Sequence, residues 1–413
     1  MKFELVRLGD YFLLEKGSSY TSANLVDESD VGLLTINAFT LGGGYKPNSE
    51  KPFSGQLKDQ YMLAEGDVLV ATTEQDSGLL ASPLVVKIHQ TKFKSLLYSL
   101  DVAKVSSVND EISPRFLFNI LRIPAFRKRA AYGDTGSTVQ RLPFEALYDL
   151  KIPKPPLLVQ EAIIRLIDSI DEKIRTNEKI TSDLEGIAQT IFKSWFIDFD
   201  PVKAKMAGEK PSGMDAATAA LFPDSMRESE LGLIPQGWNV RSIGDSVIKQ
   251  KVGKLFDSKT SFPSGSVPVL DQGKSGVVGF HDEEPGVFAS PEAPLVVFAN
   301  HTCLLRLVSY PFSVIQNVFP LTGNKVDVIW LYFAVEGKQQ FDSYKGHWPD
   351  FVLHKIIHPT VEATRAFRMI VEPLLKEKWL LEQQSKILGK IRDSLLPRLI
   401  SGELQIPEEI LAS

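Results

Sequence analysis

The residues of this sequence that are best suited to chemistry are cations gathered in one segment, Pro114 to Arg141. The segment carries six arginines and lysines against a single acid, Asp134. Hydroxyl and amide side chains lie among these cations, close to two glycines. Such a mixture suits contacts to phosphates and to the edges of bases. The same charges also have a plainer interpretation, a solvated helix face with salt bridges.

We predict two sets of nucleic-acid contacts, one in each half of the chain. In the first set, Arg141 would take a phosphate or a guanine edge, and Gln140 suits adenine. The first set comprises Lys16, Tyr20, Arg129, Ser137, Thr138, Gln140 and Arg141. The second set comprises Lys249, Lys251, Lys254, Gln272, Lys274, Lys345 and His347. Each member of the second set could instead be solvated surface.

The sequence lacks the motifs of the catalytic sites that such a protein could carry. Gly273-Lys274-Ser275 has no upstream glycine of a phosphate-binding loop. No Asn/Asp-Pro-Pro-Tyr/Phe stretch, which adenine methyltransferases use to hold a flipped base, is present. His354 and His358 are four apart, but the glutamate of a zinc protease motif is missing. We therefore expect no catalytic residue, no metal site and no cofactor bound by this chain.

Composition gives the general class of protein. The 413 residues suggest two or three domains, and 43% hydrophobic with 23% charged residues is ordinary for a globular protein. Cys303 is the one cysteine, so no disulfide can form within the chain. No run approaches the length of a membrane span, and the first residues have no apolar signal core. We expect a cytoplasmic protein without a membrane partner. The net charge of −5 requires that any DNA-binding surface be local.

Two long helical stretches must position these residues. The first runs from Leu157 to Phe196, and its apolar residues recur at steps of three and four, the seam of a helix pair. Shifted by 204 residues, the pattern returns toward the end of the chain. The predicted seam comprises Ile163, Ile167, Ile170, Leu184, Ile191, Trp195, Phe367, Val371, Leu374, Leu388, Leu395 and Leu399. A helix packing only on its own domain is the plainer alternative. Two stripes in matching register favour antiparallel packing of one helix on the other.

The segments before the two helices also repeat. Phe3 to Asp10 is mirrored by Trp238 to Asp245, at an offset of 235. Both segments mix strand-like runs with turns, such as Val68 to Ala71 and Leu295 to Phe298. We therefore expect an α+β fold in which two mixed α/β domains are joined by two long antiparallel coiled-coil helices in a pseudo-twofold arrangement. The expected divisions are 1–151 and 237–355 for the domains, 152–205 and 356–413 for the helices, and 206–236 for a linker.

The order of these parts resembles the specificity subunit of type I restriction-modification systems. The resemblance covers essentially the whole chain. It is carried by Leu231-Gly232-Leu233-Ile234-Pro235-Gln236-Gly237-Trp238, by the pair Leu8-Gly9-Asp10 and Ile243-Gly244-Asp245, by Gly136 to Arg141, and by Ile152 to Pro156 with Gln160-Glu161. The second helix departs from this pattern, because Thr364-Arg365 stands where the first has Gln160-Glu161.

The resemblance implies a mechanism. Each domain would recognise one half of a split, asymmetric target in double-stranded DNA, and helices of about 60 Å would set a separation on the order of 17 base pairs. Two methyltransferase subunits would dock on the helices, and the restriction and translocase subunits would join through them. S-adenosylmethionine, ATP and Mg²⁺ would belong to those partners. The alternative from another class is a coiled-coil scaffold whose globular ends bind proteins. An autonomous methyltransferase is disfavoured by the missing motifs.

Overall fold

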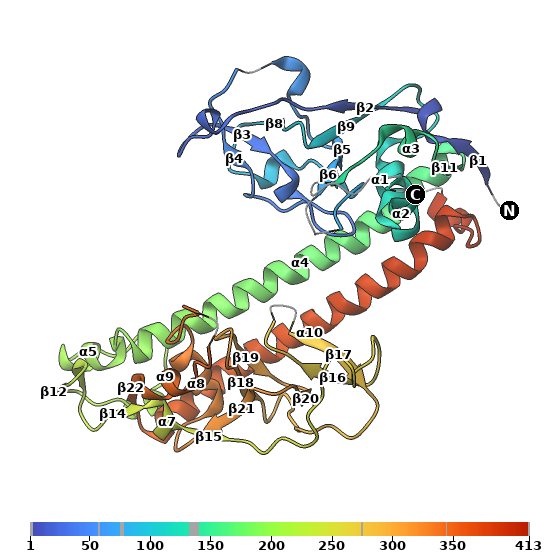
Figure 1. Cartoon of the computed structure of the whole chain (residues 1–413). Helices are drawn as coiled ribbons and strands as arrows, with labels where there is room; N and C mark the ends of the chain where they lie inside the picture. Colours follow the sequence, from blue (N-terminus) through green and yellow to red (C-terminus); the bar gives the residue numbers. More distant parts are fainter. Residues whose placement is uncertain are drawn as a thin grey trace. The chain divides into compact units, whose positions relative to one another are not determined.

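The computed structural model describes residues 3–56, 58–74, 78–131, 140–273, 276–343 and 345–411. The chain divides into two compact units (Figure 1). Unit 1 consists of Met1–Arg175 with Ser385–Ser413, and unit 2 of Thr176–Gln384. Each unit thus contains one globular domain and a segment of each of the two long helices, α4 (Leu157–Phe196) and α10 (Val361–Ile400).

Unit 1 is built on two small sheets and two two-stranded ladders. A four-stranded antiparallel sheet has the order β2-β9-β5-β7, and a three-stranded sheet has the order β4-β3-β8. The strands are β1 (Glu4–Arg7), β2 (Phe12–Lys16), β3 (Val31–Leu34), β4 (Lys51–Pro52), β5 (Val68–Ala71), β6 (Thr73–Glu74), β7 (Pro83–Val85), β8 (Ser95–Tyr98), β9 (Val102–Ser107), β10 (Gln140–Arg141) and β11 (Lys151–Lys154). The short helices are α1 (Pro114–Arg122), α2 (Pro124–Ala130) and α3 (Phe144–Tyr148), with 3-10 turns η1 (Leu8–Asp10), η2 (Ser22–Asn24), η3 (Ile36–Ala38), η4 (Asp59–Tyr61) and η5 (Ile88–Gln90).

Unit 2 repeats this plan. Its four-stranded antiparallel sheet has the order β15-β21-β18-β19, and its three-stranded sheet the order β17-β16-β20. The strands are β12 (Met226–Ser229), β13 (Gly232–Pro235), β14 (Asn239–Ser242), β15 (Val247–Lys249), β16 (Val267–Leu270), β17 (Val277–His281), β18 (Leu295–Ala299), β19 (Leu305–Val308), β20 (Ser313–Val314), β21 (Val318–Gly323) and β22 (Lys355–His358). The short helices are α5 (Asp200–Met206), α6 (Ala216–Ala220), α7 (Ile243–Ser246), α8 (Val328–Val335) and α9 (Trp348–Leu353), and α11 (Glu408–Leu411) follows α10 in unit 1.

The two domains are therefore copies of one topology. Strand for strand, β2, β3, β5, β7, β8 and β9 correspond to β15, β16, β18, β19, β20 and β21. The parallel pairing of β3 with β8 recurs between β16 and β20. The offset falls from 235 residues at the first strands to 204 at the long helices. Most of this difference arises between β3 and α1, where the connections of the first copy are longer, and the rest between α1 and α3, where the first copy has α2.

The entry and exit of each domain are joined by a ladder. β1 pairs antiparallel with β11, and β14 pairs in the same way with β22. In both copies, the strand that opens the domain thus lies beside the strand that leads into the long helix. The repeated segments Phe3–Asp10 and Trp238–Asp245 contain the opening strands β1 and β14. In each copy the ladder fixes where the long helix begins.

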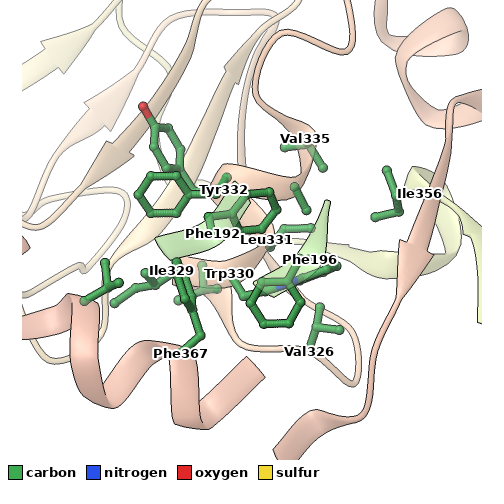
Figure 2. Close-up of a cluster of buried hydrophobic side chains, with 14 of the residues drawn as sticks. Phe192, Phe196, Val326, Ile329, Trp330, Leu331, Tyr332, Val335, Ile356 and Phe367 are labelled. Carbon is green, nitrogen blue, oxygen red and sulfur yellow. The ribbon is translucent and has the colours of Figure 1, made fainter. Parts of the chain in front are cut away.

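Each domain buries one helix against its sheet. α1 starts with Pro114 after the N-cap Ser113, whose hydroxyl accepts from the Arg115 N–H at 3.2 Å, and residues 116–122 are buried. Its counterpart α8 is capped by Asp327 and is buried along its whole length. Figure 2 shows Ile329, Trp330 and Leu331 of α8 among Phe192 and Phe196 of α4 and Phe367 of α10. The long helices therefore belong to the domain cores and do not act only as connectors.

Within each unit the two long helices pack antiparallel. In unit 1, Ile163 and Ile167 share a core with Leu396 and Leu399. In unit 2, the Asn177 amide donates to Gln384 at 2.8 Å, and Lys378 reaches Glu185 at 3.0 Å. Residue numbers rise along α4 while those of their partners fall along α10. The prediction of antiparallel packing is confirmed within each unit.

The buried face of α10 differs from the predicted seam. Leu374 and Leu388 are only half-buried, whereas Leu375 and Trp379 are 3% and 8% exposed. On α4, Ile170, Leu184 and Ile191 are half-buried, while Ala188 and Phe192 are buried. The remaining seam residues are buried, except Leu395, which is half-buried against the core of unit 1. The shift arises because the helices in unit 2 also pack on α8, so the buried face is turned toward the domain.

The segment expected to be a linker is mostly exposed but is anchored to unit 2 at a few residues. Phe222 is 1% exposed and lies edge-on to Trp195 at 5.2 Å. Lys205 donates to the carbonyls of Ala219 and Phe222, and β12 and β13 form a hairpin. The segment also contains a short helix, α6, capped by Asp215. Its aromatic anchor makes this segment part of the core of unit 2. Among the described residues, no helix combines the length and apolarity that crossing a membrane requires.

Candidate nucleic-acid interface

One end of each four-stranded sheet gathers polar residues from several loops. At this end of unit 1, β5 finishes at Ala71, and the Thr72 N–H donates to Asp101 O at 3.0 Å. In unit 2, β18 finishes at Ala299, and the Asn300 N–H donates to Asn317 O at 3.0 Å. The two ends are equivalent because Ala71 pairs with Val102 as Ala299 pairs with Val318. We call these two sheet ends the recognition edges.

A returning loop covers each recognition edge. In unit 1, Arg141 pairs with Thr73 and Gln140 with Glu74, and the Leu142 N–H donates to Thr72 O at 2.8 Å. Both Gln140 and Arg141 are exposed. A short ladder to β6 therefore fixes their backbone while their side chains remain available. The structure thus places these two predicted contacts on the first recognition edge.

The second recognition edge holds its returning loop through one side chain and one backbone hydrogen bond. The His301 ring Nδ1 lies 2.9 Å from Lys345 O, and the His347 N–H donates to Asn300 O at 2.9 Å. His301 follows Asn300 as Thr73 follows Thr72, so Lys345 occupies a place like that of Arg141. Lys345 is exposed and forms ion pairs with Asp342 at 3.3 Å and Asp350 at 3.1 Å. A DNA contact by Lys345 would have to compete with these carboxylates.

Lysines from the first strand of each sheet lie beside the recognition edges. Lys16 ends β2, is exposed, and places its ammonium 5.1 Å from the centre of the Phe144 ring. Lys249 ends β15 and lies 3.9 Å from Trp348, the ring equivalent to Phe144, and 3.8 Å from Phe319. Burial lowers the pKa of Lys249. The aromatic ring attracts the ammonium group, so the side chains of Lys16 and Lys249 are held in place beside the recognition edges. A lysine that is already held in place loses less entropy when it contacts a phosphate.

The other predicted contacts of the second set are placed differently. Gln272 is half-buried, and its side-chain oxygen accepts from the His301 N–H at 2.7 Å, so it holds the edge together. Lys254 is ion-paired with Glu283 at 2.6 Å. Lys251 is exposed. His347 is fully buried, with its ring Nε2 3.0 Å from Ser343 O, so its prediction as a DNA contact is corrected to a structural role.

In the first set, Tyr20 is half-buried against the small core of Leu33, Phe53 and Leu97, and Arg129 is exposed in the last turn of α2. Ser137, Thr138 and Lys274 lie outside the described residues.

Three of the six cations of the basic segment, Arg115, Arg122 and Arg127, stabilise the first domain. Arg115 donates to Asp168 and Arg122 to Asp171, both on α4. The buried Arg127 donates to the carbonyls of Leu121 and Arg122, which closes the C-terminal end of α1. Burial lowers the pKa of Arg127. These three arginines have structural roles, and they do not form the solvated helix face of the plainer interpretation, because Arg122 and Arg127 are buried.

Sequence reasoning overlooked the amides and the imidazole of the second edge. Asn300 accepts from the Trp348 N–H at 2.7 Å, and the Asn317 amide lies 3.1 Å from the His301 ring. No periodic pattern marks such loop residues. The sequence nevertheless indicated their position, because Thr72 and Asn300 come at the ends of the predicted strands Val68 to Ala71 and Leu295 to Phe298.

The recognition edges present cations, amides and hydroxyls, without a catalytic arrangement on the described part of the chain. No group of three or more His, Cys, Asp or Glu among the described residues is placed to hold a metal ion. His354 and His358 face different partners, Gln339 at 3.0 Å and Asn324 O at 3.4 Å. Such an arrangement suits recognition of a polar, anionic ligand.

The chain contains two copies of one domain. Each copy carries a recognition edge and is followed by a long helix, as in a protein with two recognition domains. Residues 1–186 match the family described as the type I restriction modification DNA specificity domain. The match covers the first domain and most of α4. The resemblance inferred from the sequence is thereby confirmed.

Similarity to individual specificity subunits extends over much of the chain. The type I restriction enzyme HindI specificity subunit of Haemophilus influenzae is 24% identical, covering 86% of this chain and 89% of the relative. The MjaIX specificity subunit of Methanocaldococcus jannaschii is 23% identical over 72% of this chain and 71% of its own. The type I restriction-modification S subunit from M. genitalium has a similar fold, with a TM-score of 0.56 and 15% identity over 98% of this chain and 97% of that one.

Proposed function

We propose that this chain is the non-catalytic, sequence-specific DNA-recognition subunit of a type I restriction-modification enzyme, and that it recognises a split, asymmetric target. Each domain would contact one half of the target through its recognition edge. Gln140 and Arg141 would act in the first domain, and Lys345 with the neighbouring amides in the second. Loops that differ between the copies would recognise different bases, since direct readout depends on individual side chains.

The observation that carries this proposal is the repetition of the fold. The family match ends at residue 186, but the second copy has the same strand orders as the first. Its recognition edge is closed by the same backbone hydrogen bond, from Asn300 to Asn317, as the bond from Thr72 to Asp101. What the match implies for the first domain therefore extends to the second.

We further propose that the long helices dock two methyltransferase subunits, through which restriction subunits join. Apolar side chains remain exposed on the helix segments of both units. In unit 2 these are Ile187 at 48% and Leu380 at 61% exposed, and in unit 1 Ile387 at 57% and Ile391 at 44%. Isolated apolar residues are ordinary on a surface, but stripes on a helix pair suit contact with another protein.

The decisive experiment is methylome sequencing of host cells with and without this chain. We expect one bipartite methylation motif that is present only with the chain. Exchange of residues 3–151 for the corresponding domain of a relative should change one half of the motif and leave the other half unchanged. A continuous motif, or one unaffected by the exchange, would contradict the proposal.

Binding in vitro separates this function from that of a protein scaffold. The affinity of the complex with its methyltransferase subunits for a duplex carrying the motif should fall steeply with salt, because phosphate contacts release counterions. Assembly through apolar helix faces should change little with salt. The double variant Ile187→Glu with Leu380→Glu should impair assembly, whereas Lys179→Glu, at an exposed polar position of α4, serves as the control.

A further inference from the structure

A groove in unit 2 lies toward the end of the four-stranded sheet opposite the recognition edge, and it carries cations that the edge does not use. It is formed by the end of β21, the start of β18 and the first turns of α10. The charged side chains that line it are Lys251, Lys325, Arg365, Arg368, Glu292 and Asp327. Phe288 also lines the groove and is 66% exposed.

The acids of this groove have cationic partners. Arg368 pairs with Asp327 at 3.3 Å, and Lys376 pairs with Glu292 at 3.4 Å. Both cations also pair with Glu372, at 2.8 and 3.0 Å. Lys251, Lys325 and Arg365 are exposed and have no ion-pair partner among the described residues. The lining of the groove carries four cations against two acids, and this excess of two positive charges favours an anionic ligand.

The backbone at one of these cations is unusual. Lys325 has a backbone φ of +59°, a conformation that residues other than Gly and Asn seldom adopt. The turn after β21 therefore holds a lysine where a glycine would cost less. Such an outlier points to a use for the side chain.

The first domain provides an internal comparison. Ser107 and Gly323 are equivalent because they pair with Phe12 and Val247, the first residues of equivalent strands. Lys325 thus corresponds to Asn109, which Asp110 and Glu111 follow. At the offset of 204, Arg365 corresponds to Glu161. The same place is acidic in the first copy and basic in the second, so the charge is not a requirement of the fold.

We propose that this groove binds the phosphodiester backbone of DNA outside the half-site recognised by unit 2, and that the first domain has no such site. This inference rests on the proposed function. DNA is favoured as the ligand because the groove has an excess of cations and because Lys251, which lines it, lies two residues after Lys249, a lysine beside the recognition edge. Phosphate contacts would set the register of the second domain on the duplex without adding sequence preference.

The test uses the full chain assembled with its methyltransferase subunits, and two duplexes, one with the motif and one with a scrambled sequence. Lys325→Ala and Arg365→Ala should each weaken binding of both duplexes by the same factor. Each should also reduce the slope of log affinity against log salt by about 0.9. The charge-retaining variants Lys325→Arg and Arg365→Lys should restore the slope. Lys259→Ala, an exposed lysine of the same unit, is the matched control and should leave it unchanged.

The comparison between copies gives a second arm. Arg365→Glu installs the residue of the first copy and should weaken binding more than Arg365→Ala, whereas Glu161→Ala should not weaken it. Methylphosphonate substitutions at single phosphates should identify positions that matter to the wild type and no longer matter to the Lys325→Ala, Arg365→Ala double variant.

Several outcomes would overturn the inference. One is an unchanged salt slope in both alanine variants while the wild type binds its motif, which would leave the proposed function intact. Another is normal DNA binding with impaired subunit assembly, which would assign the groove to an acidic protein segment. A third is calorimetric binding of inorganic phosphate that the variants abolish without any effect on DNA. If the wild-type complex itself shows no preference for the motif, the proposed function fails instead.

Discussion

Arg122 donates two hydrogen bonds, of 2.6 and 3.1 Å, to the carboxylate of Asp171, and so fastens α1 of the first domain to α4. The side chains are 6% and 15% exposed. Arg392 of α10 donates to the same carboxylate at 2.8 Å. Burial opposes ionisation of Asp171, but the two arginines outweigh it and hold its pKa below the ordinary value. One carboxylate thus joins the domain to both helix segments of unit 1.

The first prediction concerns this carboxylate. Asp171→Ala should cost about 3–5 kcal/mol of unfolding free energy in unit 1, because it leaves two arginines without their common partner. Since the folded pKa lies below the unfolded one, the contribution of Asp171 is present above about pH 4 and is lost as the pH falls further. Urea unfolding at pH 7 and pH 3 measures both effects. Equal destabilisation by Asp171→Ala at the two pH values would refute this account.

The second prediction concerns His358, which is 5% exposed and whose pKa is lowered by burial. The folded state therefore binds fewer protons than the unfolded state near neutral pH, so the stability of unit 2 should fall as the pH drops through about 6. His358→Gln should remove part of this dependence. Thermal unfolding between pH 8 and pH 5 tests it, and a variant as sensitive to pH as the wild type would assign the titration to another group.

The third prediction concerns the recognition edges. Arg141→Ala or Gln140→Ala should cost about 1–3 kcal/mol on the motif and relax one base position in the half recognised by the first domain. Preference in the other half should be unchanged. Lys345→Ala should act only on the half recognised by the second domain. Binding to a panel of single-base variants of the motif measures all three. Uniform weakening across the panel would assign the residue to a phosphate.

The fourth prediction concerns the segment between α5 and β14. Phe222→Ala should destabilise unit 2 by about 3–5 kcal/mol, because a ring that is 1% exposed leaves a cavity beside Trp195 and Trp238. Limited proteolysis should then cut between residues 206 and 225 faster than in the wild type. The exposed Leu231→Ala, at 45%, is the control. Cleavage at equal rates would show that the segment is free in both proteins.

The sequence revealed the features that depend on near neighbours in the chain. The steps of three and four from Ile163 to Trp195 are a property of one helix, and α4 has the bounds Leu157–Phe196 that the pattern indicated, while α10 is of the same length. The repeat of Phe3–Asp10 in Trp238–Asp245 correctly indicated two copies of one fold. α10 continues through Pro373, which is exposed, so the carbonyl left without a donor faces solvent.

The tertiary structure decided which of several residues of similar chemistry is buried, ion-paired or available for a contact. Arg115, Arg122 and Arg141 belong to one basic segment, yet the first two find aspartates on α4 and only Arg141 remains on the recognition edge. His347 and Lys345 are two residues apart, yet one is buried and the other exposed. Leu375 replaces Leu374 in the core because α8 packs on the helix pair. Periodicity and composition are local, whereas burial and ion pairing depend on partners that the fold brings from distant parts of the chain.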